Sequence, residues 1–135
     1  MTTVREINIQ HTAWEDERGW GLNPFKTSGV PEDASLNLHI VSLKPGFVRG
    51  NHYHTNATEW MLVYGGSAKF LSKPIRENTV KEIFIKDEKP VLLEIPPNVE
   101  HAVINESKND VYLVVFSSSV EPDTIRCPSL FELKR

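Results

Sequence analysis

The sequence predicts an all-β fold in a single domain spanning residues 1–135. Apolar residues gather in eight short runs rich in branched and aromatic side chains: Val4–Ile9, Leu36–Leu43, Trp60–Tyr64, Ala68–Leu71, Val80–Ile85, Val91–Ile95, Ala102–Asn105 and Val111–Phe116. Each run is too short for a helix with a buried stripe, and turn-forming segments such as Lys44–Gly46 and Pro96–Asn98 separate several of them. A chain of 135 residues is about the size of one domain and can bury a core without disulfides. We therefore expect a β-barrel or β-sandwich.

Composition and charge exclude several classes of partner. The formal net charge is −3 and no dense cluster of Lys and Arg is present, which argues against binding to nucleic acid. No apolar run approaches the roughly 20 residues of a membrane span, and the first ten residues lack the pattern of a signal peptide. The single Cys127 cannot form an internal disulfide. We expect a cytoplasmic protein without a membrane or nucleic-acid partner.

The stretch Ala13–Ser35 has no clear hydrophobic period. It contains two Trp, three Gly and two Pro residues, a composition typical of irregular connections. We expect it to cross the mouth of the barrel without regular structure.

Two histidines and a glutamate lie close together in the middle of the chain. His52 and His54 are two residues apart, so on a strand they project from the same face. The loop between residues 55 and 58 can turn the chain so that Glu59 enters the next strand beside them. Two imidazoles and a carboxylate suit first-row divalent metals, and eight residues thus supply three candidate ligands.

A fourth candidate ligand, His101, follows a proline-rigidified turn at the start of another apolar run. Four ionisable groups inside one barrel are costly to bury unless a cation compensates them, which favours a metal site over four polar groups that merely satisfy one another. That second interpretation stays open. His11 and His39 have no partner at ligand spacing and are interpreted as surface or hydrogen-bonded histidines.

These residues fall in two motifs, G-x5-H-x-H-x4-E-x6-G from Gly46 to Gly66 and P-x-N-x2-H-x3-N from Pro96 to Asn105. The pair resembles the two motifs of the cupin superfamily, which implies a jelly-roll β-barrel with its core motifs in 46–66 and 96–105. In cupins this set implies a three-histidine, one-glutamate site for Fe, Mn, Ni, Zn or a similar ion. Asn98 stands where cupins usually have glycine, and asparagine is the residue best able to replace it in a left-handed turn.

Further segments are similar in order to cupins that act on nucleotide-linked keto-sugars, namely Asp16–Gly19, Pro24–Phe25, Arg49–His52 and Pro122–Arg126. The relevant groups are the dTDP-sugar 3,5-epimerases, the 3,4-ketoisomerases and the cupin tails of capsular-polysaccharide enzymes. This resemblance implies that His52 moves a proton next to a ketone and that Arg49 contacts a substrate phosphate.

His52 cannot ligate a metal and move the proton at once. If His52 ligates a metal, Tyr53, Tyr64 or a metal-bound water would have to handle the proton. Trp60, like Trp14 and Trp20, could stack on a sugar or base, although aromatic residues in a barrel also serve as core or dimer contacts.

The leading hypothesis is a metal-binding cupin that isomerises or epimerises a sugar or nucleotide-sugar by proton transfer next to a carbonyl. One alternative is an Fe-dependent dioxygenase that uses the same four ligands, and another is a non-catalytic small-molecule-binding cupin. A homodimer is expected, because cupins commonly pair by barrel edges and a terminal strand such as Val4–Ile9 needs a partner.

Overall fold

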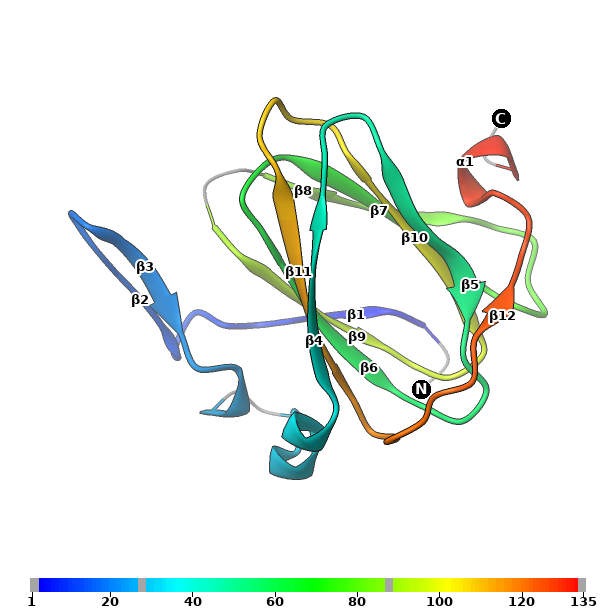
Figure 1. Cartoon of the computed structure of the whole chain (residues 1–135), viewed down its shortest axis with the longest axis horizontal. Helices are drawn as coiled ribbons and strands as arrows, with labels where there is room; N and C mark the ends of the chain where they lie inside the picture. Colours follow the sequence, from blue (N-terminus) through cyan, green and yellow to red (C-terminus); the bar gives the residue numbers. More distant parts are fainter. Residues whose placement is uncertain (1–2, 27–28, 87–88, 134–135) are drawn as a thin grey trace.

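The computed structural model describes residues 3–26, 29–86 and 89–133, and it confirms the all-β prediction. Two antiparallel sheets of five strands each face one another and form a jelly-roll barrel of the cupin type (Figure 1). In the part of the chain that the structure describes, no helix has the length and apolar character needed to cross a membrane.

Each of the eight predicted runs overlaps a strand. The first sheet has the order β1 (Arg5–Ile7), β9 (Val91–Ile95), β6 (Glu59–Tyr64), β11 (Val111–Ser117) and β4 (Leu38–Leu43). The second sheet has the order β12 (Ile125–Arg126), β5 (Val48–Tyr53), β10 (Val99–Asn105), β7 (Ala68–Pro74) and β8 (Lys81–Ile85).

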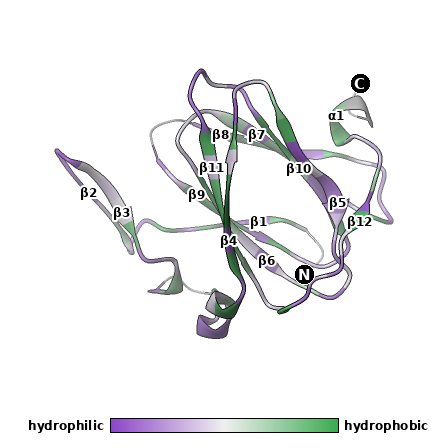
Figure 2. Cartoon of the chain, viewed as in Figure 1, coloured by the Kyte–Doolittle hydropathy of each residue, from purple (hydrophilic) through white to green (hydrophobic). Residues whose placement is uncertain are grey.

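Side chains alternate between the two faces of each strand, and this alternation divides the core into layers. The inward residues of both sheets form the main cluster, in which Val63, Phe70 and Leu93 are fully buried. A second cluster around Trp60 and Leu62 covers the outer face of the first sheet. Figure 2 shows hydrophobic residues along the barrel strands and hydrophilic ones at the tip of the hairpin that leaves the barrel.

That hairpin corrects the expectation of an irregular segment over 13–35. Residues Ala13–Asp16 and Gly19–Leu22 form an antiparallel pair, β2 and β3, which projects away from the barrel (Figure 1). Two short 3₁₀ helices follow, η1 (Pro24–Lys26) and η2 (Glu32–Leu36). The strands escaped prediction because, at four residues each, they carry no run of alternating apolar residues.

A one-residue β-bulge interrupts the pairing of β5 with β10. His52 lies opposite His101, but the next residue of β10, Ala102, lies opposite Gly50, so Asn51 is the extra residue. Gly50 and Asn51 both have positive φ, +103° and 59°. The bulge reverses the alternation of side chains. Arg49 therefore faces the barrel interior together with His52, although the two are an odd number of positions apart.

The bulge also anchors the C-terminal segment. The carbonyl of Asn51 accepts a hydrogen bond from the amide of Cys127 (2.9 Å), and its side-chain oxygen accepts one from the amide of Leu130 (2.9 Å). Leu130, the first residue of α1 (Leu130–Leu133), is buried against Leu71 and Ala102 on the outer face of the second sheet. Strand β12 is thereby held along β5, with Arg126 opposite His52.

The bulge predicts a large difference between two glycine substitutions. A Cβ at Gly50 would lie 2.7 Å from the carbonyl oxygen of His101 and 2.9 Å from the Cα of Ala102, both backbone atoms. A Cβ at Gly46, where φ is also positive (+81°), meets nothing within 4 Å. Gly46→Ala should cost about 1 kcal/mol for the conformation alone, and Gly50→Ala more than about 3 kcal/mol. Urea unfolding followed by tryptophan fluorescence measures both, and equal losses would contradict the steric account.

Candidate functional site

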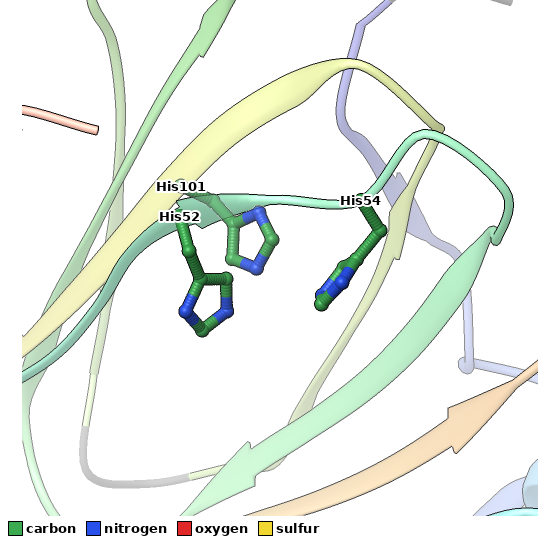
Figure 3. Close-up of side chains that lie close together, drawn as sticks. All are labelled: His52, His54 and His101. Atoms are coloured by element: carbon green, nitrogen blue, oxygen red, sulfur yellow. The ribbon is translucent and has the colours of Figure 1, made fainter. Parts of the chain in front are cut away.

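Three histidines converge inside the barrel. His52 and His101 lie opposite each other on β5 and β10, and His54 follows the last residue of β5. The ring centroid of His52 is 4.8 Å from that of His101 and 5.1 Å from that of His54. The ligand nitrogens of the three residues lie within 4.8 Å of one another (Figure 3). The two sequence motifs that carry these histidines therefore converge in the structure.

Glu59 brings a carboxylate to this cluster from the opposite sheet. It is the first residue of β6, and its Oε1 lies 3.1 Å from Nε2 of His54 and 3.6 Å from Nε2 of His101. All three side chains are buried. The cluster thus joins donors from both sheets.

Backbone carbonyls fix the orientation of two of the imidazoles. Nδ1 of His101 contacts the carbonyl of Val99 at 3.0 Å, and Nδ1 of His54 contacts the carbonyl of Asp123. A carbonyl can only accept, so each Nδ1 carries a hydrogen and each Nε2 directs its other position into the barrel. Apart from the neighbouring Glu59 carboxylate, neither Nε2 has a polar partner among the described residues. A buried imidazole nitrogen in this position is available to ligate a metal.

The donor set fits a first-row divalent cation. Metal bonds of about 2.0–2.2 Å to nitrogen and oxygen place adjacent ligand atoms about 3 to 3.5 Å apart, close to the 3.1 and 3.6 Å between Glu59 and the two Nε2 atoms. Orientation of a ligating imidazole by a carbonyl at its other nitrogen is the usual arrangement in metal sites. The three histidines could therefore hold a metal, and these ligand types suit several ions.

The cluster shifts the acidity of its own members. Burial alone would raise the pKa of Glu59, but the imidazoles of His54 and His101 outweigh it and lower that pKa. Burial acts to lower the pKa of His54, and the carboxylate of Glu59 more than reverses this effect. Burial lowers the pKa of His101, and burial with the two neighbouring imidazoles lowers that of His52 to about 4. His52 and His101 are thus neutral at neutral pH, the form in which histidine binds metals.

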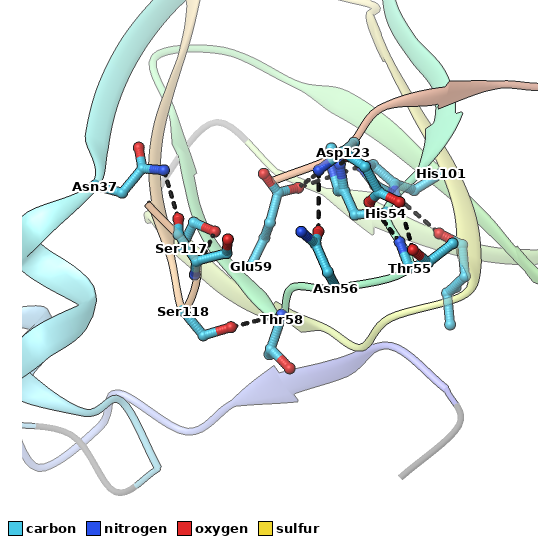
Figure 4. A network of polar contacts seen from close by, with 12 residues as sticks. Asn37, His54, Thr55, Asn56, Thr58, Glu59, His101, Ser117, Ser118 and Asp123 are labelled. Carbon is cyan, nitrogen blue, oxygen red and sulfur yellow. Dashed lines mark hydrogen bonds and ion pairs between the residues drawn. The ribbon is translucent and has the colours of Figure 1, made fainter. Parts of the chain in front are cut away.

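The segment around Asp123 holds His54 in place (Figure 4). The carboxylate of Asp123 accepts hydrogen bonds from the amide of Thr55 (2.7 Å) and from the Thr55 hydroxyl, which lower its pKa. Its own amide donates to the side chain of Asn56 (3.0 Å). The C-terminal segment therefore clamps the turn that carries His54, a role for Pro122–Arg126 that the sequence alone did not specify.

A cavity of about 400 Å³ opens in front of the histidines. Arg49 and Arg126 line it, and Glu59 is the one carboxylate in its lining. The Nε of Arg49 donates to the carbonyl of Ser42 (2.8 Å). Two guanidinium groups against one buried carboxylate favour an anionic ligand at the mouth.

Sequence reasoning missed two residues of this cavity. Arg126 lines the cavity because β12 places it opposite His52. A strand of two residues leaves no periodic signal in the sequence, so this placement was not predicted. His39 is exposed, as predicted, yet it also lines the cavity from β4.

Three predicted site residues lie elsewhere. Tyr53 follows His52 directly and faces the opposite side of β5, next to Ile125. Trp60 and Tyr64 lie on the outer face of β6, because Glu59 takes the inward position and side chains alternate from there. Trp60 is buried and its indole N–H donates to Glu94 (3.1 Å), while Tyr64 stacks on Tyr112. The structure does not bring these three residues to the cavity.

The jelly-roll barrel and its inward histidines define the chain as a cupin. It belongs to the polysaccharide biosynthesis C-terminal domain family, whose sequence profile matches residues 14–125. The chain is 30% identical over 116 residues to UDP-2-acetamido-2,6-beta-L-arabino-hexul-4-ose reductase of Pseudomonas aeruginosa, a match that covers 83% of this chain and 30% of the reductase. It therefore spans less than a third of the length of that curated relative.

The chain is similar to solved structures of a sugar ketoisomerase and of a capsular polysaccharide protein. A double mutant of the QdtA 3,4-ketoisomerase from Thermoanaerobacterium thermosaccharolyticum, in complex with TDP, superposes with a TM-score of 0.74 at 25% identity, covering 93% of this chain and 88% of QdtA. Another QdtA variant holds TDP-4-keto-6-deoxyglucose. The capsular polysaccharide assembling protein CapF from Staphylococcus aureus superposes with a TM-score of 0.61 at 22% identity, covering 68% of this chain and 26% of CapF.

The donor set predicts metal binding by the purified protein. After chelation and resupply with Zn²⁺ or Mn²⁺, the wild type should retain about one ion per chain. His101→Ala removes an oriented ligand and should weaken binding by more than about a hundredfold. His11→Ala, which alters an exposed histidine outside the cluster, is the matched control and should leave the affinity unchanged. Competition with a chromophoric chelator measures both, and equal affinities of the His101 variant and the wild type would contradict the site.

Proposed function

We propose that the chain is a sugar ketoisomerase that acts on a nucleotide-linked keto-sugar by moving a proton next to the ketone. The observation that carries this proposal is the bulge at Gly50–Asn51, which sets the guanidinium of Arg49 and the imidazole of His52 on the same wall of one cavity. A cation for the phosphate and a base for the sugar are thereby within reach of a single ligand.

The orientation of the rings supports a division of roles in the cluster. His54 and His101 are held by carbonyls with their Nε2 atoms near Glu59. The ring nitrogens of His52 have no hydrogen bond to any other described residue. We assign His54, Glu59 and His101 to the metal and His52 to the proton. A bound divalent ion would supply positive charge near the oxygen on which negative charge develops.

The proton transfer is balanced within the sugar. The imidazole of His52 takes the proton from the carbon next to the ketone, and the electrons of that bond form an enediolate. The ring then returns its proton to the former ketone carbon, while the hydroxyl proton moves to the former ketone oxygen. The ketone has moved by one position, and His52 is neutral again.

The placement of the tyrosines favours isomerisation over epimerisation. Epimerisation needs a second proton donor on the opposite face of the sugar, and the predicted candidates Tyr53 and Tyr64 lie outside the cavity. The charge of the cavity and the TDP complexes of QdtA support a nucleotide-linked substrate. The two histidines with Glu59 also form a set that suits iron oxygenases, so oxygen consumption is measured in the same experiment.

Deuterium exchange tests the proposed reaction. Incubation with TDP- and UDP-linked 4-keto-sugars in deuterium oxide should introduce label at a carbon next to the ketone, followed by NMR, without consumption of dissolved oxygen. His52→Ala should lower the exchange rate by about a hundredfold or more. Tyr53→Phe changes the adjacent, outward-facing side chain and should leave the rate unchanged.

Label that enters as fast with the His52 variant would remove this residue from the mechanism. Uptake of oxygen with a matching keto-sugar would show a dioxygenase instead, and binding without either signal would leave a non-catalytic module.

We further propose a homodimer that pairs through β4. This strand is the outermost of its sheet, and Leu38 and Ile40 expose apolar side chains on its outer face. Light scattering should give twice the chain mass at micromolar concentration. Ile40→Lys should shift the mass toward the monomer, whereas Val120→Lys, at an exposed valine outside the strand, should not. A monomeric wild type would overturn the proposal.

A further inference from the structure

A second hollow of about 340 Å³ adjoins the histidine cavity at the turn between β4 and β5. Its lining consists of Ser42, Leu43, Lys44, Phe47, Val48 and Arg49. Val48 and Arg49 line both spaces, so the two lie side by side and share Arg49 as their common wall. Nothing in the proposed proton transfer uses the second hollow.

Phe47 presents an exposed aromatic ring at this hollow, with 65% of its surface accessible. It occupies the last position of a turn in which its amide donates to the carbonyl of Lys44 (3.1 Å), with Pro45 and Gly46 (φ +81°) at the centre. The backbone of Asn105 bonds both Gly46 (3.0 Å) and Phe47 (3.1 Å). An apolar ring held in water on a pinned backbone is preorganised to meet a flat ligand.

Cations accompany this ring. Lys44 and Arg49 lie in the lining of the hollow, and no carboxylate does. Because Arg49 bonds Ser42 through Nε alone, its two terminal nitrogens have no hydrogen bond to any other described residue. The hollow thus offers an aromatic ring and two cations, of which Arg49 also lines the cavity of His52. This arrangement matches a ligand with a flat aromatic end, two adjacent phosphates and an uncharged end.

We propose that the β4–β5 turn binds the nucleoside diphosphate end of the substrate. Phe47 stacks on the base, Lys44 and Arg49 bind the diphosphate, and the sugar extends past Arg49 to His52. This assignment rests on the proposed function for its substrate class and adds the direction in which the substrate lies. Recognition by one stacking face accommodates uracil and thymine alike, since either base has a π-face.

Calorimetric titration of the full chain with UDP, TDP and inorganic pyrophosphate tests the assignment. Phe47→Ala should weaken UDP and TDP binding by about tenfold and leave pyrophosphate binding unchanged, because only the nucleotides carry a base. Lys44→Met should weaken all three and reduce the dependence of their affinity on salt. Phe84→Ala is the matched control, since Phe84 is 63% exposed on β8 with the ammonium of Lys69 5.4 Å from its ring. It should change none of the affinities.

Three results would overturn the assignment: nucleotide affinities unaffected by Phe47→Ala, an equal loss for pyrophosphate, or a change of the light-scattering mass in that variant. The titrations need no keto-sugar, so they separate the two proposals. If nucleotide binding depends on Phe47 but no deuterium exchange occurs, the nucleotide site is retained and the isomerase is rejected. If deuterium exchange occurs and Phe47→Ala leaves the nucleotide affinity unchanged, the isomerase is retained and the nucleotide site is rejected.

Discussion

The extra residue at Gly50–Asn51 is the constraint on which the site depends. Without it, regular alternation would turn Arg49 to the opposite face from His52. At position 50 the backbone of β5 lies so close to β10 that only glycine fits. Asn51 holds the C-terminal segment that includes α1 through two hydrogen bonds. One local departure from a regular strand thus sets the charge of the cavity and secures its C-terminal wall.

The buried polar cluster exists because both sheets contribute to it. His52 and His101 come from one sheet, Glu59 from the other, and His54 from the connection between them. Charges so deeply buried are tolerated only with compensating partners. The carbonyls of Val99 and Asp123 supply one partner for each of two rings, and the Nε2 atoms of both rings lie beside Glu59, where the group could hold a metal.

Family membership establishes the fold of this chain, whereas the residues that line its cavity limit which ligand it can bind. The cupin barrel supports many reactions, so the fold alone does not choose among them. In this chain the selection comes from what lines the open space: two arginines at the mouth, a histidine whose ring nitrogens have no hydrogen bond to another described residue, and an exposed phenylalanine on a fixed turn. These features support the proposed anionic, base-bearing ligand.

Eight strands of the barrel were predictable from their apolar runs, and Glu59 and His101 were candidate ligands from the connecting loop and the resemblance to the cupin motifs. His52 and His54 were placed on one face because spacing along a strand fixes which side chains lie together. The same rule, applied forward from His52 and Glu59, would have turned Tyr53, Trp60 and Tyr64 outward. The placement of Arg49 and Arg126 in the cavity follows from tertiary structure, since the first depends on a bulge and the second on a two-residue strand pair. Both are set by long-range pairing, which leaves no period in the local sequence.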